Sequence, residues 1–210
     1  MRNALVRREI GGSGMDKIIA VTGGIGSGKT TFCNCLKRLG LNVISADEIY
    51  AELLENPEFV KRVSDAVGVQ PIVSDGKLLL DRNAVAIKVF DDSETKSRLE
   101  AITHAAVMNA GFDKARKTDG NVFFEVPLLY EGGFDKSFDK VVVVIRNDDD
   151  RISAVIGRDG KSENLIRKII KSQFDYSKLK KDGHTIFVEN NGDVEELFEK
   201  AKAVANETNI

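Results

Sequence analysis

The feature that most constrains this chain is a glycine-rich loop that ends in a lysine and a threonine. Residues 23–30 read Gly23-Gly24-Ile25-Gly26-Ser27-Gly28-Lys29-Thr30 and match the GxxxxGK[ST] pattern of phosphate-binding loops. The apolar run Lys17–Thr22 precedes the loop, and a helical pattern beginning at Thr31 follows it. The motif works only in this strand–loop–helix context. The sequence therefore predicts a nucleoside triphosphate site at this turn.

Each residue type in the loop has a separate task. Glycines let successive backbone N–H groups point into one concavity, and the positive end of the following helix adds to this anion site. Lys29 is expected to reach the β- and γ-phosphates of ATP, and the Thr30 hydroxyl is expected to bind Mg²⁺. We take the whole segment from Gly23 to Thr31 as nucleotide-binding. The alternative is a glycine-rich turn that binds nothing.

Composition and charge exclude several classes of function. The chain has 210 residues and a net charge of −2, with 31 basic and 33 acidic residues, so no global basic field attracts nucleic acid. No stretch approaches the roughly 18 apolar residues of a membrane span, and the N-terminus lacks the apolar core of a signal peptide. Cys33 and Cys35 are expected to be small core residues in a reducing compartment. We therefore expect a cytoplasmic protein without membrane or nucleic-acid partners. Separately, we expect it to be a monomer.

The alternation of apolar runs and helical patterns predicts a doubly wound α/β fold with a five-stranded parallel sheet. Nearly continuous apolar runs such as Val141–Ile145 are typical of strands that are buried on both faces. Residues 1–14 end in Gly11-Gly12-Ser13-Gly14 and are expected to be a disordered extension or a vector-derived remnant. The predicted strands are Lys17–Thr22, Leu41–Ala46, Asn121–Val126, Lys140–Arg146 and Thr185–Glu189.

Two long connections divide the predicted domain, residues 15–210. More than seventy residues separate Asp47 from Gly120, far more than a minimal crossover needs, so residues 48–119 are expected to form an inserted helical subdomain. Residues 148–181 are charged and helical, with the composition of a mobile lid. The nucleotide-binding core is then made of residues 15–47, 120–147 and 182–210.

Two carboxylates lie at predicted strand ends, where parallel sheets bind their ligands. Asp47 follows the second strand, and there it can accept the proton of a substrate hydroxyl that attacks the γ-phosphate. Its alternative role is to cap a helix starting at Glu48. Glu125 lies in an apolar run near the expected Mg²⁺ shell. The alternative for Glu125 is a strand-end carboxylate paired with a cation.

Further candidates lie in the two connections and after the third strand. Arg158 and Arg151 fall on one face of a lid helix and are expected to neutralise the transferred phosphate, although a solvated face remains the alternative. Pro127 ends the third strand and leaves Leu128, Leu129 and Tyr130 as an apolar wall. His104, in the insert, is either a structural or a functional histidine.

Together these segments resemble the dephospho-coenzyme A kinases, relatives of the nucleoside monophosphate kinases. The resemblance runs from about Lys17 to Asp193 and is carried by the phosphate loop, the strand-end Asp47, His104, Val126-Pro-Leu-Leu-Tyr-Glu131, Arg158-Asp-Gly160, Gln173 and Asn190-Asn-Gly192. It implies transfer of the γ-phosphate of ATP to the ribose 3′-hydroxyl of dephospho-coenzyme A, the last step of coenzyme A synthesis.

The resemblance also assigns roles to single residues. Asp47 would be the base or the group that orients the hydroxyl, and Lys29 and Arg158 would be the other catalytic groups. Asn190 and Gly192 would lie by the adenine, and the acceptor would contact His104 and the segment Pro127–Glu131, including Leu128, Leu129 and Glu131. One departure concerns the lid. The family has a second arginine one helical turn before Arg158, where this chain has Ala154, and Arg151 is the candidate substitute.

Two rival functions remain open from the sequence. Another P-loop kinase of a nucleoside, nucleotide or shikimate-like hydroxyl would keep the core and change the insert. A GTP-dependent switch would need an [NT]KxD guanine motif after a strand, and the nearest match, Arg116-Lys-Thr-Asp119, has a different first residue and precedes a strand.

Overall fold

The computed structural model describes residues 16–180 and 182–208, so the expectation for residues 1–14 lies outside the described chain. The protein divides into two compact units. The first contains the chain up to Ile44 and again from Ala115 onward, and the second is Ser45–Lys114. In the described residues no helix is both long enough and apolar enough to cross a membrane.

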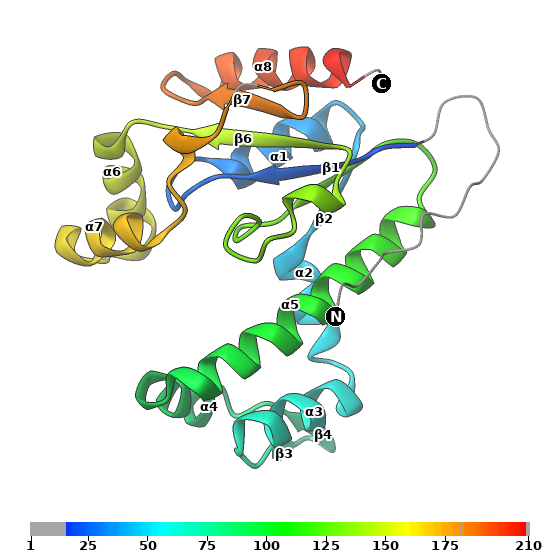
Figure 1. Ribbon diagram of the computed structural model, residues 1–210, viewed down its shortest axis with the longest axis vertical. Coiled ribbons are helices and arrows are strands. Elements are labelled where there is room, and N and C mark those ends of the chain that lie inside the picture. Colours follow the sequence, from blue (N-terminus) through cyan, green and yellow to red (C-terminus); the bar gives the residue numbers. More distant parts are fainter. Residues whose placement is uncertain (1–15, 181, 209–210) are drawn as a thin grey trace. The chain divides into compact units, whose positions relative to one another are not determined.

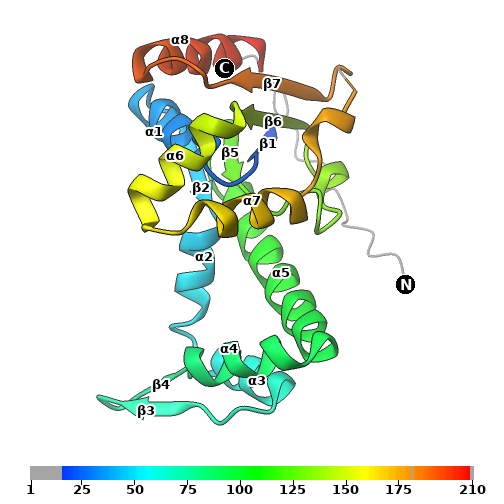
Figure 2. The same cartoon turned by 90° about the vertical axis from the view of Figure 1, so that its left-hand side faces the viewer.

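The first unit is built on a five-stranded sheet in the order β2-β5-β1-β6-β7 (Figure 1; β5 is labelled in Figure 2). β1 pairs in parallel with both β5 and β6, and β6 pairs in parallel with β7. The predicted α/β fold with a five-stranded parallel sheet is therefore confirmed. The strands are β1 (Ile18–Thr22), β2 (Asn42–Ser45), β5 (Val122–Glu125), β6 (Lys140–Ile145) and β7 (Thr185–Glu189).

Helices α1 (Lys29–Arg38) and α8 (Val194–Glu207) pack together over one face of this sheet. Alternate strand residues point toward the two helices, as the period of two along a strand requires. Both cysteines are buried in or beside this core, as expected from the sequence. The cluster contains Ile19, Val21, Phe123, Val142, Val144 and Val188 from the strands, and Phe32, Cys33, Cys35, Leu36, Leu197, Ala201 and Val204 from the helices.

The connection after β6 folds into two helices that precede the last strand (Figure 2). These are α6 (Asp148–Asp159) and α7 (Glu163–Ser172), followed by the short 3₁₀ helix η2 (Tyr176–Lys178). Ile152, Val155 and Ile166 form a small buried cluster against which Ile25 of the glycine-rich loop packs. The helix pair is thus anchored to the loop by apolar contact as well as by hydrogen bonds.

The second unit contains helices and a β-hairpin, and no sequence pattern indicated the hairpin. Its elements are α2 (Ala46–Leu53), α3 (Pro57–Val67), β3 (Ile72–Ser74), β4 (Lys77–Leu79), α4 (Arg82–Asp91) and α5 (Ser93–Arg116). The hairpin turn lies at Asp75-Gly76, and both residues have positive φ. Phe59, Val60 and Val63 of α3 form the centre of this unit's core.

Candidate active site

The glycine-rich loop lies at the carboxyl end of β1, the central strand of the sheet. β1 is flanked by β5 on one side and β6 on the other, so the strand order reverses at this position. Crevices that bind ligands in open α/β sheets form at such points, outside the carboxyl ends of the strands. The fold therefore places the loop of residues 23–28 at the ligand-binding edge.

Gly28 is required for both the conformation and the packing of the loop. It caps the N-terminus of α1 in the left-handed conformation, with φ 92°, which a side chain disfavours. A Cβ atom there would also clash with the amide of Asn190. That amide is buried and donates a hydrogen bond of 2.9 Å to the Ser27 carbonyl. Asn190, directly after β7, thus stabilises the loop through its hydrogen bond to Ser27.

The helix begins at Lys29, two residues earlier than predicted, because Gly28 rather than a later residue ends the loop. The Lys29 ammonium donates hydrogen bonds to the Gly23 carbonyl at 2.8 Å and the Gly24 carbonyl at 3.3 Å. These bonds hold its positive charge across the mouth of the loop. Lys29 is therefore placed where an anion bound by the loop N–H groups would meet it.

Thr30 and Glu125 come together from α1 and β5. The Thr30 hydroxyl donates a hydrogen bond of 2.9 Å to Glu125 Oε1, although the two residues are 95 positions apart in the sequence. Glu125 is only 8% exposed and ends its strand. Burial and the nearby Glu125 carboxylate raise the pKa of the Cys33 thiol above its usual range. The pair supplies one hydroxyl and one carboxylate oxygen, ligand types that suit Mg²⁺.

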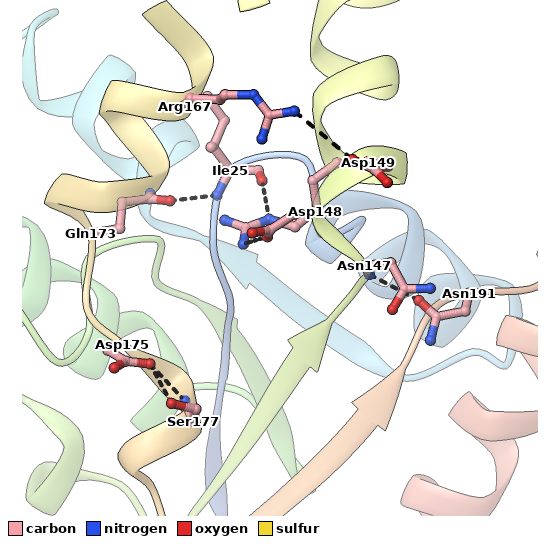
Figure 3. A network of polar contacts seen from close by, with 10 residues as sticks. Ile25, Asn147, Asp148, Asp149, Arg167, Gln173, Asp175, Ser177 and Asn191 are labelled. Carbon is pink, nitrogen blue, oxygen red and sulfur yellow. Dashed lines mark hydrogen bonds and ion pairs between the residues drawn. The ribbon is translucent and has the colours of Figure 1, made fainter. Parts of the chain in front are cut away.

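A second set of contacts ties the backbone of Ile25 to the α6–α7 segment (Figure 3). Gln173 Oε1 accepts a hydrogen bond of 2.8 Å from the Ile25 N–H. Arg151 Nε donates to the Ile25 carbonyl at 2.9 Å, and Arg151 Nη1 donates to Asp148 at 2.8 Å. The Arg151 side chain is only 14% exposed. Arg151 is therefore a component of the loop's support, with two of its donor nitrogens already paired.

The N-terminus of α6 is also fastened to the loop that follows β7. The Asn147 N–H donates to Asn191 Oδ1 at 3.0 Å (Figure 3), and the Asn190 N–H donates to the Ile145 carbonyl at 2.8 Å. Gly192 comes next, where a Cβ atom would clash with the Glu196 carboxylate. The segment Asn190–Gly192 is thereby brought beside the start of α6 and the glycine-rich loop.

Arg158 lies at the end of α6 and has a 66% exposed side chain. It donates two hydrogen bonds to the Asp159 carboxylate, at 2.6 and 3.0 Å. This guanidinium holds the pKa of Asp159 at about 2. Because the folded-state pKa is lowered, Asp159 stays ionised as long as the pH remains above that value. Arg158 lines a cavity of about 190 Å³ together with Lys29 and Thr30.

The segment after β5 differs from the uniform apolar wall expected from the sequence. Leu128 is 41% exposed, whereas Leu129 is 0% exposed and serves as a core anchor. The Glu131 carboxylate accepts a hydrogen bond of 2.9 Å from the Phe174 N–H. Tyr130 stacks on Phe174 with ring centroids 4.6 Å apart. This segment, which begins at Pro127, is thus linked to the chain that follows α7.

Asp47 and His104 both belong to the second unit. Asp47 lies in the first turn of α2, is exposed, and follows the last residue of β2 by two positions. The N-cap of α2 is Ser45, so the alternative in which Asp47 caps a helix starting at Glu48 is wrong. His104 is half-buried in α5.

Two residues near the loop were given no role by the sequence analysis. Arg146 follows β6 directly and lines cavities on the loop. Tyr176 is half-buried beside Phe174, and burial raises its pKa to about 12. Arg146 gave one signal in the sequence, since a charged residue ends an otherwise apolar run. Tyr176 gave none, because its position depends on how the chain after α7 returns to the sheet.

Comparison with known proteins gives a consistent result. The model of the dephospho-CoA kinase family matches residues 17–196. A curated dephospho-CoA kinase of Fusobacterium nucleatum is 35% identical over 186 residues, covering 88% of this chain and 95% of that protein. One from Chlamydia pneumoniae is 36% identical over 189 residues, covering 87% and 91% respectively.

Solved structures show the same fold. The crystal structure of TT1252 from Thermus thermophilus aligns with a TM-score of 0.76 and 30% identity, covering 91% of this chain and 97% of that one. A dephospho-CoA kinase structure from Campylobacter jejuni aligns with a TM-score of 0.67 and 24% identity, covering 92% and 98%. At 24% identity this second likeness shows the fold alone.

Proposed function

The chain belongs to the dephospho-CoA kinase family, and from this premise we propose how its residues carry out the family's reaction. The enzyme transfers the γ-phosphate of ATP to the ribose 3′-hydroxyl of dephospho-coenzyme A, which gives coenzyme A and ADP. This is the final step of coenzyme A biosynthesis. The observation that carries the proposal is the glycine-rich loop at the switch point of the sheet, with Lys29 held across it.

The donor half of the reaction is assigned to the first unit. The loop N–H groups and Lys29 would hold the phosphates, since phosphoryl transfer depends on positioning and charge neutralisation more than on covalent chemistry. Asn190 supports the loop through Ser27, and Arg158 lines the cavity at the first turn of α1. Asn190 and Gly192 are proposed to lie by the adenine. Thr31 is assigned with the loop to nucleotide binding because it lines the same cavity.

Thr30 and Glu125 would hold Mg²⁺, and the donor set fits that ion. A kinase Mg²⁺ is bound by one or two protein oxygens, with phosphates and waters completing the shell. When bound, the ion neutralises charge on the phosphates. The hydrogen bond between Thr30 and Glu125 keeps both side chains together.

The acceptor half is assigned to Asp47, His104 and the segment Pro127–Glu131. Asp47 would accept or orient the proton of the 3′-hydroxyl, because an exposed carboxylate without a capping duty is available for that task. Leu128 is the exposed apolar residue of the segment after β5, and Glu131 orders that segment through Phe174. His104 is proposed to contact the acceptor from the second unit.

Acceptor preference tests the proposed function. ATP turnover should be far faster with dephospho-coenzyme A than with adenosine, AMP or shikimate as acceptor, measured by ADP release at matched acceptor concentrations. Chelation of Mg²⁺ with EDTA should abolish turnover, and added Mg²⁺ should restore it. Preference for another acceptor would instead support a different small-molecule P-loop kinase. Full activity in EDTA would contradict the proposal that Thr30 and Glu125 bind Mg²⁺.

The two lid arginines should differ in their effect on turnover. Arg158→Ala is expected to lower kcat by about 100-fold, the scale of removing one preorganised charge donor from a transition state. Arg151→Ala should mainly raise the KM for ATP, because Arg151 holds the Ile25 carbonyl and Asp148. Steady-state kinetics with saturating acceptor separates the two effects. A larger kcat loss in Arg151→Ala would show that their roles are reversed.

We also propose that the enzyme works as a cytoplasmic monomer without a nucleic-acid partner. The net charge of −2 supports the last point, since nothing in the overall charge attracts a polyanion. Light scattering coupled to size-exclusion chromatography measures the assembly state directly, and a dimer mass at assay concentration would contradict the monomer.

A further inference from the structure

Arg146 carries an unsatisfied charged donor beside the glycine-rich loop. It is the first residue after β6, at the same carboxyl edge of the sheet as the loop. Its Nε atom is buried and has no hydrogen-bond partner among the described residues. Leaving a buried donor unpaired is unfavourable, and more so when the donor is charged. A bound ligand could supply the hydrogen-bond acceptor that Arg146 Nε lacks.

The surroundings of Arg146 indicate that this acceptor is an anion. Arg146 lines the cavity of about 190 Å³ that is formed mainly by the loop and the first turn of α1, including Lys29 and Thr30. It also lines a neighbouring cavity of about 400 Å³ with Gly24 and Ser27 of the same loop. The smaller cavity is bounded by the glycine-rich loop and by the N-terminal turn of α1, both of which favour negative charge. A planar guanidinium matches phosphate oxygens in geometry as well as in charge.

Arg151 and Ala154 explain why Arg146 is needed. Ala154 lies at the position where the family resemblance led us to expect an arginine, and it lines the same cavity as Arg146 and Arg158. Arg151 was the candidate substitute, but its Nε and Nη1 are committed to the Ile25 carbonyl and to Asp148. Of these residues, Arg146 is the one that combines a positive charge, an unpaired buried donor and a place on the cavity.

We infer that Arg146 binds the phosphate chain of ATP and supplies the positive charge that Ala154 cannot. The assignment rests on the proposed function only in taking ATP as the donor. The residue that replaces the missing lid arginine is then Arg146, directly after β6, and not Arg151 of α6. Arg151 then acts as a positioning residue for the loop, and Arg146 acts on the ligand.

The inference is tested by nucleotide binding to the full chain without acceptor. Arg146→Gln should raise the Kd for ATP and ADP by about 10- to 100-fold, the effect of losing one charge-assisted contact. Binding of adenosine, which has no phosphate, should change by less than about twofold. Isothermal titration calorimetry measures the Kd of ATP and of ADP directly. Competition with labelled ATP measures the Kd of adenosine. Arg146→Lys, which keeps the charge, should lose less affinity than Arg146→Gln.

Two further variants make the outcome decisive. Adding Ala154→Arg to Arg146→Gln should restore ATP affinity to within a few-fold of the wild type. Arg167→Gln is the matched control. This half-exposed arginine of α7 pairs with Asp149 (Figure 3) and with Glu163, and its replacement should leave ATP affinity unchanged. Unchanged ATP affinity in Arg146→Gln, equal losses for ATP and adenosine, or a failure of Ala154→Arg to restore binding would each overturn the inference.

The outcome is separable from that of the proposed function. A wild-type enzyme that prefers another acceptor would contradict the function and leave the ATP-binding role of Arg146 intact. If the wild-type enzyme phosphorylates dephospho-coenzyme A and Arg146→Gln binds ATP normally, the function is supported and the role of Arg146 is contradicted. Thermal unfolding followed by circular dichroism checks that each variant is folded. If Arg146→Gln does not fold, the ATP affinity of Arg146→Lys tests the inference.

Discussion

Lys29→Ala is expected to lower kcat/KM for ATP by about 10³-fold or more, because the variant loses a charge positioned for the transferring phosphate. The structure gives this expectation its geometric basis. The Lys29 ammonium lies against the Gly23 and Gly24 carbonyls, at 2.8 and 3.3 Å, and so spans the loop that binds the phosphates. Alanine has high helix propensity, so α1 itself should persist in the variant.

The control for this experiment lies on the same helix. Lys37→Ala removes an exposed lysine from the last turn of α1, away from the loop, and should change kcat/KM by less than about twofold. Steady-state kinetics with ATP and dephospho-coenzyme A measures both variants. Wild-type activity in Lys29→Ala would exclude the loop as the catalytic site, whereas an equal loss in Lys37→Ala would point to damage to the helix.

The three central strands β1, β5 and β6 were predictable because they are buried on both faces. Runs such as Val141–Ile145 have no polar face to confuse with a helix, and the phosphate loop fixes the order of strand, turn and helix around β1. The hairpin of β3 and β4 was missed for the opposite reason. Each strand has three residues, and five of the six are exposed, so the hairpin has no apolar pattern to announce it.

The sequence predicted some of the residues of the site, but it did not predict the hydrogen bonds between them. Lys29 and Thr30 follow from the motif, and Glu125 stands out as a carboxylate in an apolar run. The hydrogen bonds that order the site join residues far apart in sequence, such as Asn190 to Ser27 and Gln173 to Ile25. No local spacing encodes such pairs, since they arise only when the parallel strands bring their carboxyl ends together.

Arginine assignments show the same limit in sharper form. Spacing on a helix face favoured Arg151 as a ligand-binding residue, because Arg151 and Arg158 are seven positions apart. The three-dimensional structure instead pairs Arg151 with the loop backbone and leaves Arg146 with a buried donor to satisfy. Which arginine is committed and which is available depends on tertiary contacts, and helical periodicity contains no information about those contacts.

Asp47→Asn should lower kcat by about 10²- to 10⁴-fold, the range for loss of a general base, while the Kd for ATP changes by less than about threefold. The amide keeps the size of the side chain and its place in the first turn of α2, but it cannot accept a proton at neutral pH. Ser45 holds the cap position of that helix, so the substitution removes no cap and should leave its stability nearly unchanged.

Glu48→Gln is the matched control for this substitution, since Glu48 is the adjacent exposed carboxylate in the same helical turn. It makes the same change of charge one residue further along, so any effect of net charge or of the helix dipole should be common to both variants. A large kcat loss confined to Asp47→Asn therefore identifies a group that acts on the acceptor hydroxyl. Equal, small effects in the two variants would leave Asp47 with no catalytic role, and the hydroxyl would then have to lose its proton without a base from α2.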